Sequence, residues 1–311
     1  MLDWLKFFPY ATRTKSNQAE VRGPYFQGQK KYQWRLGESV LTFKAPRSNP
    51  ILSLSGEGWP LKRSSPGKNN ILKKNWQKEY LSGSEAPPSD WVFDYFYSDR
   101  WYFVGPWFTG VQAWLSTAAF LVRPCKNSNF LGENLFHPRV FELAIANFLD
   151  NRFGYQKNGR NSHYRGPLNW RSLPLSNSIQ AVVCDIHQIG NSSKDDPLLI
   201  RLVFLPTTPN SFIYIAFDFA GTKINRDKVC AEPMFKLCDS IINSFHLDVG
   251  AKTQAEWDKV KATCPDMSIT DSFGELPWPL KKEKKSKNPK EVDITPASDP
   301  IVIEYDKSSS R

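Results

Sequence analysis

The sequence predicts an α+β protein in which an antiparallel sheet is covered on one face by two amphipathic helices. Three segments rich in β-branched and aromatic residues predict a strand meander over Ile179–Ile189, Leu198–Leu205 and Phe212–Phe219. The next segment, Glu232–His246, spaces its apolar residues as a helix does. Strands joined by short turns form antiparallel sheets, and amphipathic helices bury their apolar side against such sheets.

Further strands are predicted before the meander. Lys31–Ala45 predicts two short strands, and Ile71–Leu81 predicts a helix because its apolar residues lie four apart. Trp91–Tyr97 is strongly aromatic and predicts a strand that ends in a tight turn at Ser98 and Asp99.

The segment Trp101–Val122 contains no charged residue and is long enough to span a bilayer. Glycine and proline at Gly105 and Pro106 interrupt it, and Gln112 lies inside it. A spanning helix with such interruptions needs neighbouring helices to satisfy its backbone. We therefore expect two buried strands, and a membrane-associated protein that uses residues 101–122 is an alternative.

Two amphipathic helices are expected to cover the sheet. The first is His137–Phe153, where Pro138 suits the first helical turn and Gly154 is a stop signal. The second is Glu232–His246, with Pro233 near its start. The apolar residues of each follow the i, i+3, i+4, i+7 spacing of one buried helix face. A short helix is also expected after the second, over residues 257–264.

Composition divides the chain into four parts: an N-terminal arm at 1–30, an α+β domain at 31–250 with a Pro- and Gly-rich insert at 46–90, a C-terminal extension at 251–279, and a charged flexible tail at 280–311. The tail is expected to stay solvated because Lys281–Lys290 is too polar to pack.

The chain is basic, with 41 Lys and Arg against 31 Asp and Glu and a net charge of +10. Such a balance favours an acidic partner: nucleic acid, an anionic membrane surface or an acidic protein. Much of the charge lies in Lys281–Lys290, so the body is only mildly basic. This run also lacks the aromatic residues that single-strand binding uses. An acidic protein is therefore the expected partner.

Cysteine and histidine usage points away from metals and disulfides. The five cysteines are odd in number and show no zinc-binding spacing, and the four histidines are scattered. We expect no metal and no cofactor. Free cysteines suit a reducing compartment, and the N-terminus lacks the pattern of a secretory signal. The expected location is the cytoplasm.

The predicted sheet offers one cluster with catalytic residue types. If Ile200, Leu202 and Phe204 face the helices, a second set of side chains points away from them: Asp185, His187, Arg201, Tyr214 and Asp218. A histidine beside carboxylates suits a general base. Since no nucleophile is placed beside it, a salt-bridged sheet face is expected, and an enzyme is the alternative.

The segment Tyr155–Trp170 mixes glycines with the residue types that dominate protein–protein hot spots. We predict an exposed loop that binds an acidic protein through five residues: Arg160, His163, Tyr164, Arg165 and Trp170. The alternative is a polar connection whose aromatic side chains pack back on the body.

The order of these elements, closed by the motif Asp239–Leu247, resembles the PsbP-like and DcrB-like α+β fold over Lys31–Val249. In those proteins a similar last helix closes the domain. Bacterial immunity proteins that neutralise type VI secretion effectors include members that look like this. The resemblance implies a non-catalytic protein that binds another protein, such as a secreted toxin encoded nearby. The insert Pro46–Pro88 and the basic tail depart from the pattern.

Overall fold

The computed structural model describes residues 23, 29–47, 68–75, 77–79, 90–104, 111–154, 164–188, 198–220 and 228–274. The chain divides into two units, Met1–Pro279 and Leu280–Arg311, and all described residues lie in the first. Almost all of the predicted N-terminal arm, most of the insert and the whole charged tail lie outside the described residues.

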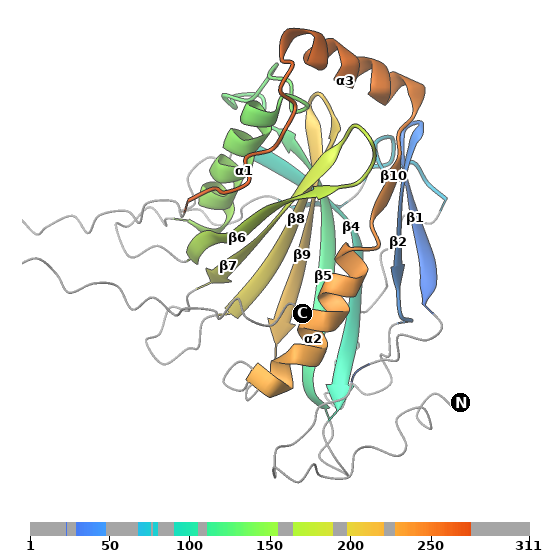
Figure 1. The fold of residues 1–311 in the computed structure, drawn as a ribbon, viewed down its shortest axis with the longest axis vertical. Coiled ribbons are helices and arrows are strands. Elements are labelled where there is room, and N and C mark those ends of the chain that lie inside the picture. The colour runs from blue at the N-terminus through green and yellow to red at the C-terminus, as the bar shows by residue number, and fades with distance from the viewer. Residues whose placement is uncertain are drawn as a thin grey trace, which may run out of the picture. The chain divides into compact units, whose positions relative to one another are not determined.

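A seven-stranded sheet forms the centre of the described structure (Figure 1). Every neighbouring pair of its strands is antiparallel. Its strands, in spatial order, are β3 (Gln77–Glu79), β4 (Trp91–Val104), β5 (Val111–Pro124), β9 (Ser211–Ala220), β8 (Leu198–Thr208), β7 (Gln180–Gln188) and β6 (Tyr164–Pro174). The predicted meander is confirmed as β7, β8 and β9.

A second, three-stranded sheet has the order β1 (Lys30–Leu36), β2 (Ser39–Ala45), β10 (His246–Asp248). The predicted strand pair in the N-terminal part of the domain is confirmed as β1 and β2. Gly37 turns the chain between them at φ 70°, a left-handed conformation that glycine adopts without steric cost. Below, this is called the small sheet.

Three helices complete the described part of the structure: α1 (Pro138–Phe153), α2 (Lys228–Ile242) and α3 (Ala251–Thr263). The predicted first helix is confirmed almost residue for residue. The second starts earlier and ends earlier than predicted. Ser244 explains the end, because its hydroxyl donates to the carbonyl of Ile241 at 2.7 Å and accepts from the amide of Lys44 at 2.8 Å. The chain therefore leaves the helix and joins the small sheet as β10.

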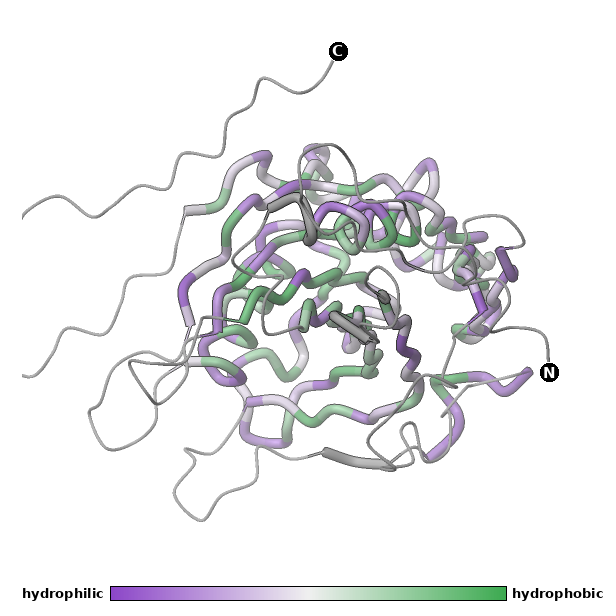
Figure 2. Tube along the Cα trace, turned by 90° about the horizontal axis from the view of Figure 1, so that it is seen from below, coloured by the Kyte–Doolittle hydropathy of each residue, from purple (hydrophilic) through white to green (hydrophobic). Residues whose placement is uncertain are grey.

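The two main helices lie on opposite faces of the large sheet, so the expectation that both cover one face is wrong. Alternate residues of β9 show this: Phe212 and Tyr214 belong to the core with α1, whereas Ile213 and Ile215 belong to the core with α2 and the small sheet. The error has a physical cause. Strands buried on both faces are apolar throughout, and helix periodicity does not say which face a helix covers. Figure 2, which views the molecule from below, shows apolar stretches of the chain in the interior of the described structure.

Aromatic side chains fill both cores. On the α1 side, the ring of Phe148 lies 4.9 Å from that of Tyr214 and 5.9 Å from that of Phe204. On the other side, the ring of Trp34 lies 5.0 Å from that of Phe96 and 4.9 Å from that of Phe43. Each core thus joins its covering layer to the sheet through edge-to-face and tilted ring contacts, which are favourable aromatic geometries.

Two local predictions before the first helix need correction. Residues 71–74 form a turn rather than a helix, and Gln77–Glu79 is strand β3. Strand β4 continues through Ser98 and Asp99, where a turn was predicted, and both residues are only 3% exposed. Pairing with β5 overrides the turn propensity there, since Ser98 lies opposite Ala118 and Asp99 opposite Thr117.

The uncharged stretch lies in the sheet. Trp101–Val104 ends β4 and Val111–Val122 lies in β5, while residues 105–110 are outside the described residues. Trp101 and Leu115 are fully buried in the core beneath the small sheet. No helix in the described part of the chain combines the length and apolarity that a membrane crossing requires.

The predicted C-terminal extension packs on the domain as far as it is described. Trp257 and Val260 of α3 join the core on the α2 side. Residues 264–274, called the strap here, then pass to the other core, where Ile269 is buried beside α1. The strap and α3 therefore connect the two layers on either side of the large sheet.

Candidate functional site

The small sheet has one apolar and one polar face. Tyr32, Trp34 and Leu36 of β1 and Leu41 and Phe43 of β2 pack inward against the large sheet. Successive side chains of a strand point to opposite faces, so the residues between them point outward. These outward residues are Lys31, Gln33 and Arg35 of β1, Val40, Thr42 and Lys44 of β2, and His246 and Asp248 of β10.

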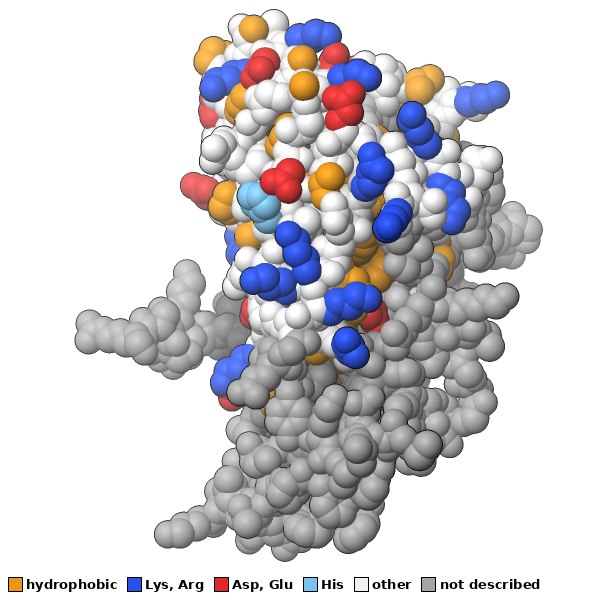
Figure 3. Space-filling view, turned by 90° about the vertical axis from the view of Figure 1, so that its right-hand side faces the viewer, with side chains coloured by type: hydrophobic (Ala, Val, Ile, Leu, Met, Phe, Trp, Pro, Cys, Tyr) orange, Lys and Arg blue, Asp and Glu red, His pale blue; other side chains and the backbone are white. Residues whose placement is uncertain are grey.

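The register of β1 and β2 brings separate cations together. Lys31 is paired with Lys44, and both side chains are exposed. Arg35 lies at the other end of β1, opposite Val40. Like charges directly across an antiparallel pair destabilise the sheet. We call this outward surface, which carries Lys31 and Lys44 near one end and Arg35 near the other, the basic face. Figure 3 shows Lys and Arg side chains gathered on this side of the molecule.

The acidic side chains beside the basic face are already engaged. Asp248 pairs with His246 at 3.1 Å, and Glu38 pairs with Lys252 at 3.0 Å. The hydrogen bond from Lys252 holds the pKa of the Glu38 carboxyl below its usual value. With the residues that the structure describes, Lys31, Arg35 and Lys44 form no ion pair. The face therefore presents uncompensated positive charge to solvent.

A turn next to β1 extends this surface. The amide of Ile71 donates to the carbonyl of Arg35 at 2.9 Å. The Asn70 side chain accepts hydrogen bonds from the amides of Gly37 at 3.0 Å and Leu72 at 3.1 Å. The Asn70 side chain thus joins the turn to the β1–β2 hairpin by hydrogen bonds. As a result, the exposed Lys73 of the turn lies close to Arg35.

A cavity of about 490 Å³ opens between this turn, the β1–β2 hairpin, the β8–β9 hairpin and the start of α3. Leu36, Leu72, Phe136 and Pro209 supply apolar lining. Its cationic lining residues are Arg35, Lys73 and Lys252. Arg35 belongs to both the cavity and the basic face, so the two are continuous.

The sequence-predicted binding loop is only partly described. Arg160 and His163 lie outside the described residues. Tyr164, Arg165 and Trp170 lie in strand β6 rather than in a loop. Tyr164 is buried against Phe153, with ring centroids 6.2 Å apart, and burial raises the pKa of its hydroxyl. Arg165 is half-buried opposite His187.

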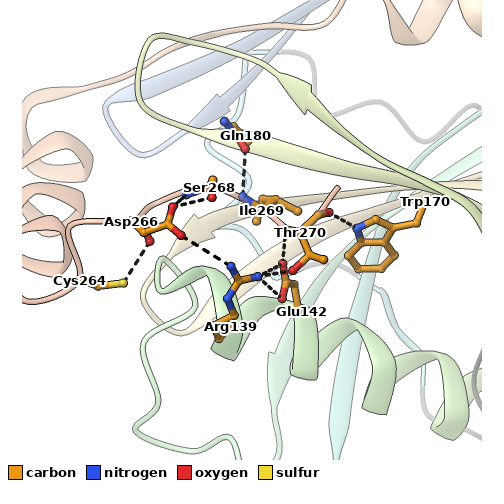
Figure 4. Close-up of polar contacts among 9 residues, drawn as sticks. All are labelled: Arg139, Glu142, Trp170, Gln180, Cys264, Asp266, Ser268, Ile269 and Thr270. Atoms are coloured by element: carbon orange, nitrogen blue, oxygen red, sulfur yellow. Dashed lines mark hydrogen bonds and ion pairs between the residues drawn. The ribbon is translucent and has the colours of Figure 1, made fainter. Parts of the chain in front are cut away.

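Trp170 is a structural residue in this fold. Its indole N–H donates to the carbonyl of Thr270 at 2.9 Å (Figure 4). Its ring also stacks on that of Phe273, with the centroids 4.7 Å apart. The Thr270 amide donates to Glu142 of α1 at 2.6 Å, and Arg139 holds the same carboxylate at 2.9 Å. Tyr164 and Trp170 therefore pack back on the body, and the expectation of an exposed loop is wrong for both.

The proposed catalytic cluster is divided between the two faces of the sheet. Asp185 and Arg201 face α2, where Arg201 reaches Asp239 at 2.6 Å. Tyr214 faces α1 and packs against Phe148, and Asp218 follows it on the same side of β9. His187 shares the face of Asp185 by strand alternation. The sheet itself therefore separates the members of the predicted cluster.

Both carboxylate oxygens of Asp185 accept hydrogen bonds from neighbouring side chains. Arg201 donates to it through two nitrogens, at 2.8 and 3.1 Å, and the Asn169 amide donates at 3.0 Å. Burial lowers the pKa of the Arg201 guanidinium, but its hydrogen bonds to the Asp185 carboxylate have the larger effect, so the pKa is raised overall. The guanidinium also lies 6.0 Å from the ring centroid of Phe219. This arrangement anchors α2 to the sheet and leaves no free carboxylate to act as a base.

The described part of the chain contains four free cysteines, of which Cys125 and Cys264 are half-buried. Cys184 and Cys238 are buried, and burial raises the pKa of both thiols, so they stay protonated. No cluster of three or more His, Cys, Asp or Glu residues is positioned for a metal ion among the described residues.

No protein-family model matches this chain, and no curated protein is similar to it in sequence. The basic face was not recognised in the sequence, because its cations are spread over two strands and meet only through their register. The sequence did contain a signal. In this segment Lys31 and Arg35 stand at odd-numbered positions and the apolar Trp34 and Leu36 at even-numbered positions, as in a strand with one charged and one apolar face.

Proposed function

We propose that this is a cytoplasmic, non-catalytic protein that binds an acidic protein through its basic face. The observation that carries the proposal is the pairing of Lys31 with Lys44 across β1 and β2, with neither ammonium joined to a carboxylate among the described residues. An acidic partner supplies the missing counter-charge. Complementary charge speeds association and excludes partners of the same sign.

The chemistry of the basic face favours a protein over single-stranded nucleic acid. Bases stack on exposed aromatic side chains in single-strand binding proteins. On β1 the aromatic residues Tyr32 and Trp34 point inward to the core, and the outward positions hold Lys31, Gln33 and Arg35. Such a face offers charge and hydrogen-bond donors without a stacking platform.

A narrower form of the proposal is an immunity protein that neutralises a secreted bacterial toxin. What supports it is the resemblance of Lys31–Val249 to PsbP-like and DcrB-like immunity-type proteins, together with the chain's aromatic cores. Co-purification with the product of a neighbouring gene tests this narrower assignment separately from the basic face.

The experiment for the main proposal is a fluorescence-anisotropy titration of labelled poly-L-glutamate. The test variant carries Lys31→Glu, Arg35→Glu and Lys44→Glu. The matched control carries Lys126→Glu, Lys236→Glu and Lys261→Glu, which reverse the same amount of charge at exposed positions elsewhere. We expect roughly tenfold or greater weakening for the test variant, and a small change for the control.

Salt and a competing polymer complete the design. Binding to the wild-type protein is expected to weaken at high salt, because salt screens exposed charges. Equal affinity of both triple variants would contradict the proposal. Tighter binding of single-stranded DNA than of poly-L-glutamate, lost in the same test variant, would assign the face to nucleic acid instead.

A further inference from the structure

The cavity beside the basic face lies where an acidic partner would extend beyond β1. Arg35 lines both surfaces, and Lys73 adds a second cationic side chain, whereas the charge of Lys252 is met by Glu38, which also lines the cavity. The apolar part of its lining comes from Leu36, Leu72, Phe136 and Pro209. The site thus combines an apolar lining with two cations, Arg35 and Lys73, that form no ion pair among the described residues, while its acidic residues Glu38 and Glu256 are paired with Lys252 and Lys259.

The size of the cavity restricts its occupant. At about 490 Å³ it lies within the range of roughly 300–1,000 Å³ typical of small-ligand pockets, and so it has room for one large side chain. Protein interfaces obtain much of their affinity from a few aromatic anchors that fill such pockets, surrounded by polar contacts. Charge attraction alone on an exposed face contributes more to association rate than to affinity.

The walls of the cavity are held in place without any ligand. Asn70 fixes the turn through its bonds to Gly37 and Leu72, and the Ser39 hydroxyl joins Thr253 of α3 at 2.9 Å. On the β8–β9 side, Thr207 and Ser211 bond to each other at 2.9 Å. A pocket formed in advance lowers the ordering cost of binding.

We propose that this cavity takes an aromatic side chain from a glutamate- or aspartate-rich segment of the partner protein, which rests on the proposed function. The carboxylates on either side of the aromatic residue would contact Arg35, Lys73 and the basic face. The aromatic ring would contact Leu36, Leu72, Phe136 and Pro209. Charge brings the segment to the face, and the anchor residue holds it there.

Two short peptides test the anchor. Both are glutamate-rich and fluorescently labelled; one carries a central tryptophan and the other a central alanine. Burial of a large apolar side chain is worth roughly ten- to hundredfold in affinity, so the tryptophan peptide is expected to bind tighter by that factor.

A cavity-filling variant tests whether the tryptophan of the peptide binds in this cavity. Glu256 lines the cavity from α3 and pairs only with Lys259 of its own helix among the described residues. Glu256→Trp adds bulk at the cavity, whereas Glu256→Gln removes the same charge without the bulk. We expect Glu256→Trp to abolish the advantage of tryptophan over alanine, and Glu256→Gln to retain it. Thermal melting of both variants confirms that each stays folded.

The outcomes separate this inference from the proposed function. Equal binding of the two peptides to the wild-type protein, weakened in the basic-face variant, would overturn the anchor and leave the basic face in place. An advantage of tryptophan that survives Glu256→Trp would also overturn it, because the ring would then bind elsewhere. Binding of neither peptide would contradict both proposals.

Discussion

Lys31 of β1 lies directly opposite Lys44 of β2 on the outward face of the small sheet. The two strands are otherwise well suited to pair, since their inward residues, among them Trp34 and Phe43, are buried together. Repulsion between the two lysine ammonium groups therefore destabilises the pairing of β1 with β2. The proposed binding of an acidic partner would relieve this repulsion and would thereby link the stability of the small sheet to the occupancy of the basic face.

Removal of one lysine should stabilise the free protein. Lys31→Gln or Lys44→Gln is expected to raise the free energy of unfolding by about 0.2–1 kcal/mol, because the cross-strand repulsion is lost. The double variant should gain little beyond either single variant, since the first substitution already removes the interaction. Lys126→Gln, in the loop before α1, serves as the control. Urea denaturation measures all four, and a lower midpoint in the single variants would contradict the repulsion.

The two cores should respond independently to truncation. Phe148→Ala and Phe245→Ala are each expected to cost about 3–5 kcal/mol as buried aromatic truncations. Because Phe148 lies with α1 and Phe245 with the small sheet, on opposite faces, their costs should add. Leu143→Ala, at a side chain that is 60% exposed, should change stability little. Strong non-additivity of the two phenylalanines in chemical denaturation would count against separate cores.

Elements with local signals could be predicted from the sequence, and elements that depend on distant partners could not. Helix α1 carries its own proline start, apolar period and glycine stop. Strand β6 does not: Gly166 and Asn169 adopt φ of 150° and 51°, and its register to β7 shifts twice. Its glycine, proline and asparagine residues are typical of a loop. Only pairing with β7 and contact with the strap make it a strand.

The candidate site had the same limitation. The strands that carry the basic face were predicted, but Lys31 and Lys44 become neighbours only through register, and Lys73 and Lys252 arrive from distant segments. By contrast, composition alone placed Tyr164 and Trp170 in an exposed loop. Large aromatic residues are as typical of cores as of hot spots, so residue type could not decide between the two.

Replacing Arg201 should lower the free energy of unfolding strongly, whereas replacing Asp239 should lower it only slightly. Arg201→Met is expected to cost about 3–5 kcal/mol, because it leaves the carboxylate of Asp185 buried without its cation. Asp239 is 43% exposed, so Asp239→Asn should cost less than about 1 kcal/mol. Guanidinium chloride denaturation measures both. The reverse order of the two costs would show that the buried Arg201–Asp185 pair contributes less to stability than the contact of Arg201 with Asp239 of α2.

Asp218 should make stability depend on pH. Burial raises its pKa to about 6, although Arg100 and Arg152 lower it. Between roughly pH 4 and 6 the folded protein retains a proton that the unfolded chain has released, so this group's contribution to stability is lost as pH rises through 6. Asp218→Asn should therefore raise the thermal midpoint at pH 7, with a difference that shrinks towards pH 4. The exposed Asp271→Asn is the control, and a constant difference across this range would contradict the raised pKa.

Trp170 should matter for stability and not for binding. Trp170→Ala is expected to cost about 3–5 kcal/mol, since the ring stacks on Phe273 and is buried beside the strap. Trp170→Phe retains a ring but loses the bond to Thr270, so it should cost about 0.5–1.5 kcal/mol. Neither variant should change the affinity for poly-L-glutamate where it is folded. A loss of affinity without a loss of stability would return Trp170 to the binding surface.

The most direct test of the account is the location of acidic-partner binding on the wild-type protein. Backbone amide resonances can be followed by NMR while poly-L-glutamate is titrated in. We expect the resonances of Lys31, Arg35 and Lys44 to shift together and to saturate at one affinity, while those of Arg165 and Trp170 stay in place. Shifts confined to β6, with the resonances of β1 and β2 unchanged, would contradict it.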